Sequence, residues 1–393
     1  MFQSLPAPNA DSILALMQTF RQDPRADKID LGVGVYKDAS GNTPIMRAVK
    51  EAERRLLDEQ STKTYLGPVG DPIFSDLMRR LVLADRVDTT RLSAAQTPGG
   101  SGALRLLFDL VRYAGGTPTI WTSTPTWPNH LAIIGQIGMT SRPYRYFDPE
   151  TRAVDFSAMM DDLGQAKAGD VVLLHGCCHN PTGANLKPDD WREIAELVIE
   201  RGLVPFVDLA YQGFGDGLDA DAAGARLLAE RVPEMLLAVS CSKNFGLYRD
   251  RVGVAFALSA ERDRADTQGA LSTLSRTNWS MPPDHGAAVV RKVLEDDALK
   301  ADWLAELETM RLRMLDLRRG LSISLRDAAG SDRFGFIAEH RGMFSLLGAS
   351  AEQVRDLREK HAIYIIGDSR MNVAGLPEAK MDHLARAFLA VGM

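Results

Sequence analysis

The chain has 393 residues, of which 45% are hydrophobic and 25% charged, and its formal net charge is −6. These values are typical of a globular enzyme with a large core that divides into two domains. The acidic balance argues against nucleic acid and anionic membranes as main partners, because both attract basic surfaces. No apolar run approaches the roughly 18 residues of a membrane span, and residues 1–8 lack the basic start and apolar block of a signal peptide.

The N-terminal residues predict an arm, a helix and a strand. Residues 1–10 contain two prolines and no periodicity, which favours an extended arm. Asp11 is placed to cap a helix that runs to about Gln22. Residues 29–35 alternate as a strand, with glycines that allow close backbone approach. The expected apolar stripe of the helix consists of Ile13, Leu16, Met17 and Phe20.

Strand and helix patterns alternate between about residues 95 and 260. Short apolar runs rich in branched residues predict buried strands, and Gly99-Gly100-Ser101-Gly102 leads into a helix. The alternation predicts a mostly parallel sheet covered by helices on both faces, with ligands bound beyond the carboxyl ends of the strands. The expected strands are 171–174, 203–207, 235–239 and 252–258.

The pattern changes beyond Pro282-Pro283 and predicts a smaller α/β domain. We expect this domain to include the N-terminal strand and to be connected by the first of its helices. Its expected elements are a helix at 298–321, strands at 334–338 and 343–347, a helix at 351–360, a strand at 362–366 and a final helix using Leu384, Phe388 and Val391. The predicted division is 1–44 as arm and part of the small domain, 45–310 as large domain and 311–393 as small domain.

Three cysteines in so long a chain do not make a disulfide framework, which favours a reducing cytoplasm. Cys177 and Cys178 precede His179, but the paired spacing of a zinc site is missing. We therefore expect buried free thiols and no metal.

Lys243 lies between two predicted strands, near Ser240, Ser242 and Arg251. This combination suits an aldehyde cofactor that carries a phosphate. The amine forms a Schiff base, while the hydroxyls and the guanidinium hold the phosphate. A surface lysine beside a loop serine explains Lys243 and Ser242 equally well when they are taken alone.

Further clusters match a pyridoxal-phosphate site. Residues 99–101 precede a helix and offer N–H groups and a positive helix end to a phosphate. Asp208 ends a strand, where its carboxylate can keep a pyridine nitrogen protonated. Tyr211 and Asn180 can hydrogen-bond the ring oxygen, and Trp127 can stack on the ring. Taken singly, these residues also suit turns or core packing.

Together, these clusters resemble the fold-type I pyridoxal-phosphate aminotransferases, in the aspartate and aromatic aminotransferase subgroup. The resemblance covers essentially the whole chain, and residues 33–49 and 331–336 are most similar to bacterial aromatic-amino-acid aminotransferases. It implies a large mostly parallel-sheet domain, which binds pyridoxal phosphate, and a smaller α/β domain. The matching segments are 32–38, 63–67, 97–104, 125–130, 175–184, 208–214, 240–253 and 370–375.

The resemblance implies a role for each matching cofactor residue. Lys243 forms the Schiff base and then shuttles the proton from the substrate α-carbon. Asp208 pairs with the pyridinium nitrogen, Tyr211 and Asn180 hold the ring oxygen, and Trp127 stacks on the ring. The residues expected to bind the phosphate are Gly100, Ser101, Ser240, Ser242 and Arg251.

The resemblance also implies how substrate is held. Arg370 binds the α-carboxylate of the substrate. Gly34, together with Trp127 and Asn180 of the cofactor site, also contacts the substrate. Arg276 binds a distal carboxylate, and it reaches the site from the partner subunit together with Tyr65, which implies a homodimer. A guanidinium can bind a carboxylate through two parallel hydrogen bonds, which fixes its orientation.

These roles predict ping-pong transamination of tyrosine, phenylalanine and aspartate with 2-oxoglutarate. Leu14 and Val33 match apolar positions that suit a ring, while Trp279 replaces an expected tyrosine near Arg276 and leaves the pocket's detail open. The alternative is an aspartate aminotransferase with little aromatic activity. A pyridoxal-phosphate lyase or decarboxylase is disfavoured by the presence of both Arg276 and Arg370. A nucleotide-binding oxidoreductase lacks its Gly-x-Gly-x-x-Gly fingerprint, and the intact cofactor set disfavours a catalytically silent binding protein.

Overall fold

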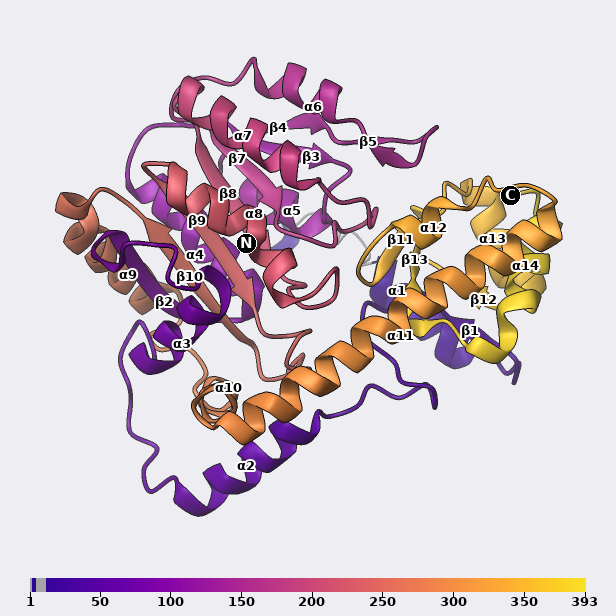
Figure 1. Cartoon of the computed structure of the whole chain (residues 1–393), viewed down its shortest axis with the longest axis horizontal. Helices are drawn as coiled ribbons and strands as arrows, with labels where there is room; N and C mark the ends of the chain where they lie inside the picture. The colour runs from indigo at the N-terminus through magenta and orange to yellow at the C-terminus, as the bar shows by residue number, and fades with distance from the viewer. Residues whose placement is uncertain (1, 5–11) are drawn as a thin grey trace. The chain divides into compact units, whose positions relative to one another are not determined.

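A computed structural model describes residues 2–4 and 12–393. The chain divides into two compact units (Figure 1). Unit 1 comprises Met1–Thr43, Pro181–Gly183 and Met314–Met393, and unit 2 comprises Pro44–Asn180 and Ala184–Arg313. The assignment of cofactor binding to residues 45–310 stays a prediction.

The N-terminal expectations fall largely outside the described residues. Of the arm expected over residues 1–10, only Phe2–Ser4 are described, and they form a short 3-10 turn, η1. The cap expected at Asp11 lies outside the described residues. The helix itself is present as α1, Ser12–Gln22.

Unit 2 contains a seven-stranded sheet in the order β2-β10-β9-β8-β7-β3-β4. Neighbours from β9 through β4 are parallel, whereas β10 is antiparallel to both β9 and β2. The expected mostly parallel sheet is therefore confirmed. The strands are β2 Leu92–Pro98, β3 Ile120–Thr124, β4 Ser141–Arg145, β7 Val171–His175, β8 Val204–Leu209, β9 Met235–Ser240 and β10 Val252–Leu258. A separate hairpin joins β5 Phe147–Asp148 to β6 Ala153–Val154.

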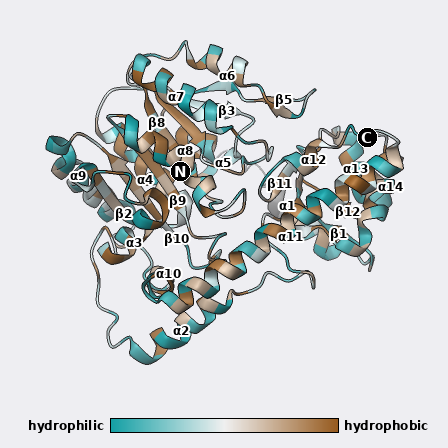
Figure 2. Ribbon diagram, in the orientation of Figure 1, coloured by the Kyte–Doolittle hydropathy of each residue, from teal (hydrophilic) through white to brown (hydrophobic). Residues whose placement is uncertain are grey.

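Helices cover both faces of this sheet, and β9 and β10 are consequently buried along their whole length. One group of helices in mutual contact contains α4, α5 and α9, and another contains α3, α7 and α8. Figure 2 shows hydrophobic residues concentrated on the central strands. The helices of unit 2 are α2 Arg47–Glu59, α3 Pro72–Leu83, α4 Gly99–Tyr113, α5 Pro128–Gln136, α6 Phe156–Leu163, α7 Pro188–Arg201, α8 Leu218–Arg231, α9 Arg264–Asn278 and α10 His285–Glu295.

Unit 1 is built around the C-terminal part of the long helix α11, Asp297–Ala329. Leu317, Leu321 and Leu325 of α11 pack into one hydrophobic core with the C-terminal helices. The N-terminal strand β1 pairs in parallel with β12, as expected for a small domain completed by the start of the chain. The remaining elements are β1 Ile29–Asp30, α12 Phe336–Glu339, β11 Phe344–Leu346, α13 Ala351–His361, β12 Ile363–Tyr364, β13 Arg370–Asn372 and α14 Met381–Ala390.

Two sequence expectations for unit 1 are wrong. The strand expected at 334–338 is instead a turn followed by the short helix α12, with Phe334 buried just before the helix and Ile337 buried within it. The strand expected at 29–35 ends at Asp30, because the Asp30 carboxylate accepts hydrogen bonds from the backbone N–H groups of Gly32 and Val33 at 3.0 and 3.4 Å. That side-chain acceptor turns the chain out of the strand.

The helix α11 begins and ends beyond the predicted range of 298–321. Its N-terminal part belongs to unit 2, where Trp303 is fully buried. The Trp303 indole stacks on Phe245 at 4.4 Å between ring centroids and donates a hydrogen bond to the Asn244 carbonyl at 2.7 Å. This contact fixes the loop that follows β9. Within residues 2–4 and 12–393, no helix is both long enough and apolar enough to cross a bilayer.

Gly253, the second residue of β10, is a position at which the close packing of the sheet can be tested by mutation. A Cβ there would lie 2.6 Å from the Gly99 carbonyl carbon and 2.7 Å from the Val239 oxygen, which are backbone atoms. We expect Gly253→Ala to lower the free energy of unfolding by about 1 to 3 kcal/mol, since neither backbone can give way. Thermal unfolding followed by circular dichroism measures the change.

Gly269→Ala is the matched control. Gly269 is an exposed residue inside α9, and its Cβ would meet nothing within 4 Å. Alanine should stabilise the helix by about 0.5 to 1 kcal/mol. Equal effects of the two substitutions would contradict the packing argument.

Candidate cofactor and substrate site

Three parallel strands end together at one edge of the sheet of unit 2. In the pairing register, His175 of β7 lies opposite Asp208 of β8, and Asp208 lies opposite Ala238 of β9. Ser240 ends β9 two residues later. The carboxyl edge of a parallel sheet is where ligands bind in such folds. The register therefore gathers the polar side chains of three separate segments.

A cradle for an anion forms where α4 begins. Gly253 pairs with both Thr97 and Ser240, which brings the start of α4 beside the end of β9. A Cβ on Gly100 would lie 2.9 Å from the Cβ of Ser240, and one on Gly99, whose φ is +75°, would lie 2.6 Å from Arg251 Nη2. Only glycine permits both approaches. Backbone N–H groups and a helix N-terminus thus meet a serine and an arginine.

The loop after β9 completes the cradle. The backbone N–H of Ser242 donates a hydrogen bond to Ser240 Oγ at 3.2 Å. Arg251 Nη1 donates to the Tyr248 carbonyl at 3.1 Å and lies 3.5 Å from Ser242 Oγ. The guanidinium is therefore held in place beside the Ser242 hydroxyl. Such a set of donors suits a phosphate.

The Lys243 amine lies next to this cradle and above the Tyr211 ring, with 4.8 Å between Nζ and the ring centroid. The pKa of Lys243 is lowered to about 8, chiefly by burial; the charge of Asp208 acts to raise it and the charge of Arg251 acts to lower it. A lysine with this pKa is partly neutral near physiological pH. A neutral amine can attack an aldehyde or accept a proton.

Asp208 is buried and accepts a hydrogen bond from His130 Nε2 at 3.0 Å. Burial acts to raise the pKa of Asp208, but the hydrogen bond and charge of His130, together with smaller contributions from His175 and Lys243, lower it below its ordinary value. The carboxylate consequently stays ionised at neutral pH. A buried carboxylate of this kind can hold the proton on a pyridine nitrogen.

A relay of hydrogen bonds behind Asp208 was missed by the sequence analysis. His130 Nδ1 and Thr126 Oγ1 are 2.9 Å apart, and the same oxygen is 3.2 Å from His175 Nε2. Burial lowers the pKa of His175 to about 3, which keeps that ring neutral. Thr126 and His130 lie in the segment 125–130, from which the role of Trp127 was predicted. Their spacing of four residues, across the first turn of α5, was the sequence signal from which their hydrogen bond could have been predicted.

Trp127 and Asn180 border this relay. Trp127 is the N-cap of α5, and its ring meets the His130 ring edge-on at 5.3 Å between centroids. Asn180 is buried, and its backbone N–H lies 3.5 Å from His175 Nδ1. Ser101 is in the first turn of α4, directly after the cradle glycines.

The remaining predicted residues lie elsewhere. Tyr65 is 85% exposed, and Arg276 is an exposed residue whose Nη1 donates to Ser280 Oγ at 2.8 Å. Gly34 and Arg370 belong to unit 1, where both contact Phe344: the Arg370 guanidinium carbon is 4.4 Å from its ring centroid, and a Cβ on Gly34 would lie 3.0 Å from its Cζ.

The residues gathered in unit 2 fit pyridoxal phosphate. The glycine cradle with Arg251 offers donors to a phosphate, Asp208 offers a negative charge to a ring nitrogen, and Lys243 offers an amine to an aldehyde. Each group is of the chemical type that the corresponding part of the cofactor requires.

Comparison with known proteins gives concordant findings. The family described as aminotransferase class I and II matches residues 26–388. The chain is 55% identical over 394 residues to the aromatic-amino-acid aminotransferase of Paracoccus denitrificans, covering 100% of both chains. It is 42% identical over 395 residues to the aspartate aminotransferase of Escherichia coli (strain K12), again covering 100% of both. A solved aromatic-amino-acid aminotransferase from Burkholderia pseudomallei, covalently bound to pyridoxal phosphate, has a TM-score of 0.96 and 37% identity, over 100% of this chain and 99% of that one.

The lowered pKa of Lys243 predicts the pH dependence of cofactor capture by the protein stripped of cofactor. The rate of pyridoxal-phosphate capture should rise with pH up to about 8 and then level off, because the neutral amine is the nucleophile. Stopped-flow absorbance at several pH values measures this rate. Asp208→Asn removes the charge that raises the pKa, so its midpoint should move to lower pH. A rate that climbs until the ordinary lysine pKa of 10.5 would contradict the assignment.

Proposed function

We propose that this chain, which belongs to the aminotransferase class I and II family, catalyses transamination of tyrosine, phenylalanine and aspartate with 2-oxoglutarate. Relatives that match its full length are named aromatic-amino-acid, tyrosine and aspartate aminotransferases. The observation that carries the proposal is the convergence of Lys243, Asp208 and the glycine cradle at one edge of the sheet. Transfer follows a ping-pong sequence, with donor and acceptor using the same site in turn.

Bound pyridoxal phosphate supplies an electron sink that stabilises negative charge on the substrate α-carbon. Lys243 Nζ takes the proton from that carbon and returns it, which its pKa of about 8 allows. The Asp208 carboxylate, kept ionised by His130, holds the ring nitrogen's proton. Tyr211 and Asn180 donate to the ring oxygen, and Trp127 covers the ring. The phosphate is bound by Gly100, Ser101, Ser240, Ser242 and Arg251.

Substrate recognition relies on arginines. Arg370 receives the α-carboxylate beside Gly34, and its contact with the Phe344 ring limits how its guanidinium can turn. Arg276 receives the distal carboxylate of aspartate and 2-oxoglutarate. Trp279 is half-buried and packs against the hydrophobic core on the α4 side of the sheet. This packing explains why a large ring occupies the position.

The protein acts as a homodimer in which Tyr65 and Arg276 serve the partner's site. Large hydrophobic side chains are exposed between residues 45 and 73, as expected for a surface that a second copy covers. They are Ile45, Leu57, Tyr65, Leu66 and Ile73. The buried thiols of Cys177, Cys178 and Cys241 are not joined in disulfides, which fits a reducing compartment, and we assign the enzyme to the cytoplasm.

A donor panel with 2-oxoglutarate tests the proposed substrates. The wild type should use aspartate, tyrosine and phenylalanine with comparable kcat/KM. Arg276→Ala should lower kcat/KM for aspartate by on the order of 100-fold or more and change phenylalanine far less, since only aspartate loses a charge partner. Arg276→Lys should fall in between, because it keeps the charge without the bidentate geometry.

The outcomes of this panel separate the candidate functions. Negligible rates with both aromatic donors would favour an aspartate aminotransferase. Equal losses of kcat/KM for aspartate and phenylalanine would show that Arg276 does not bind the distal carboxylate.

Active-site complementation tests the shared dimer. Lys243→Ala should lose steady turnover and the visible absorbance of the covalently held cofactor. Co-expressed with Arg276→Ala, it should recover about a quarter of wild-type aspartate activity, because half of randomly paired dimers contain one intact site of two. Each variant expressed alone is the control. No recovery in purified mixed dimers would contradict sharing of Arg276 between subunits.

A further inference from the structure

Two adjacent cysteines and an aspartate form a buried cluster in unit 2, outside the residues assigned above. Cys177 and Cys178 follow β7, and Asp221 lies in the first turn of α8. One potential ligand atom from each residue lies within 4.8 Å of the other two, and all three residues are buried. The sequence spacing did not predict a metal site, because the third residue comes from a distant helix.

The backbone brings both sulfurs to the same side. Successive side chains of an extended strand point in opposite directions. Cys178 instead has a φ of +50°, in the left-handed region that residues other than glycine seldom adopt. This turn at the end of β7 lets Cys177 and Cys178 both approach Asp221. A conformation of this kind costs about 1 to 2 kcal/mol, so the surrounding structure must hold it.

The Asp221 carboxylate is fixed by backbone donors. Its Oδ2 accepts hydrogen bonds from Gly213 and Gly215 at 2.8 and 2.9 Å, and its Oδ1 accepts one from Asp216 at 2.9 Å. These three hydrogen bonds leave about one acceptor position on a carboxylate that can accept about four. Metal ligands are oriented by outer hydrogen bonds in the same way.

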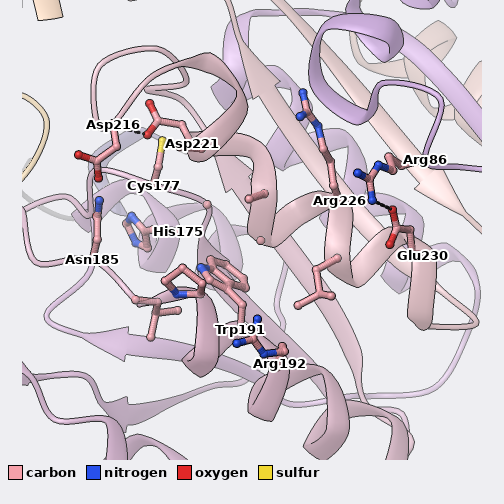
Figure 3. A pocket seen from close by; sticks show the side chains of 17 residues that line it. Arg86, His175, Cys177, Asn185, Trp191, Arg192, Asp216, Asp221, Arg226 and Glu230 are labelled. Carbon is pink, nitrogen blue, oxygen red and sulfur yellow. Dashed lines mark hydrogen bonds and ion pairs between the residues drawn. The ribbon is translucent and has the colours of Figure 1, made fainter.

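A pocket of about 400 Å³ leads to the cluster. Figure 3 shows the Cys177 sulfur and the Asp221 carboxylate directed toward each other at one end of this pocket, with the Arg86–Glu230 ion pair at the other. Two further arginines that line the pocket, Arg192 and Arg226, are likewise ion-paired with carboxylates. An ion from solvent thus has a route to Cys177 and Asp221 that does not cross uncompensated positive charge.

The geometry points to a binding site for a thiophilic divalent cation, Zn²⁺ or Cd²⁺, formed by Cys177, Cys178 and Asp221 with a fourth ligand from water in the pocket. Two thiolates and one carboxylate are ligands that Zn²⁺ accepts, whereas Mg²⁺ and Ca²⁺ require oxygen ligands. Tetrahedral ligands about 2.0 to 2.3 Å from zinc lie roughly 3.3 to 3.8 Å apart. The present separations need only a small contraction.

Binding is an exchange of ions in which no redox change occurs. Each thiol gives its proton to solvent as its sulfur bonds the cation, so one divalent ion releases up to two protons per chain. The site is separate from Lys243, and its occupation does not depend on the proposed transaminase activity.

Titration of the holoenzyme with Cd²⁺ tests the site through the ultraviolet charge-transfer absorbance of cadmium–thiolate bonds. We expect saturation at one ion per chain, release of protons and displacement by Zn²⁺. Cys177→Ser and Cys178→Ser should each weaken Cd²⁺ binding by on the order of 100-fold or more, because loss of an outer partner alone costs 10- to 100-fold.

Cys241→Ser is the matched control. Cys241 is also buried, but its sulfur contacts Met78 Sδ at 3.8 Å and is not part of the cluster. This variant should bind Cd²⁺ as tightly as the wild type. Absence of a charge-transfer band in the wild type, or equal affinity in all three variants, would overturn the site.

Anomalous diffraction from cadmium-soaked crystals of the unaltered protein gives a result that does not depend on how the variants fold. A cadmium peak between the two sulfurs and the Asp221 carboxylate supports the assignment. Peaks confined to other places would exclude it.

Discussion

The close approach of backbone to backbone at Gly253 is the constraint on which the proposed cofactor site depends. β10 lies between β2 and β9, and the missing side chain of Gly253 lets the Gly99 backbone lie against it. That approach sets the start of α4 beside Ser240 and Arg251. The phosphate cradle is therefore a result of sheet packing, with its donors supplied mainly by main-chain atoms and by residues at strand ends.

Burial then separates the behaviour of the two central ionisable groups. It lowers the pKa of Lys243 by disfavouring its cation, whereas Asp208 stays ionised because His130, with smaller contributions from His175 and Lys243, more than offsets the same effect. One group is thus ready to exchange a proton and the other to retain its charge. Thr126 and His175 extend the support behind His130, so residues far apart in sequence set the charge of Asp208.

Much of the fold was predictable because its strands are short apolar runs bounded by polar or glycine residues, as in β9 and β10. The helix α12 was not, because Phe334 and Ile337 in a short apolar run fit either a strand or a helix. The spacing of Thr126 and His130 was available in the sequence, but the contacts of that pair with His175 and Asp208, and of Cys177 with Asp221, join distant segments that spacing along the chain does not reveal. Tyr65 and Arg276 are exposed in the single chain, so their assignment to a partner's site stays a prediction from the resemblance.

The glycine cradle also constrains how such a protein can evolve. A new side chain at Gly253 would meet carbonyl and main-chain atoms, so no exchange of a neighbouring residue for a smaller one could make room for it. Selection can therefore alter which amino acids are accepted while the backbone packing of the proposed cofactor site stays unchanged. New substrate preferences should arise in this lineage without a change of fold.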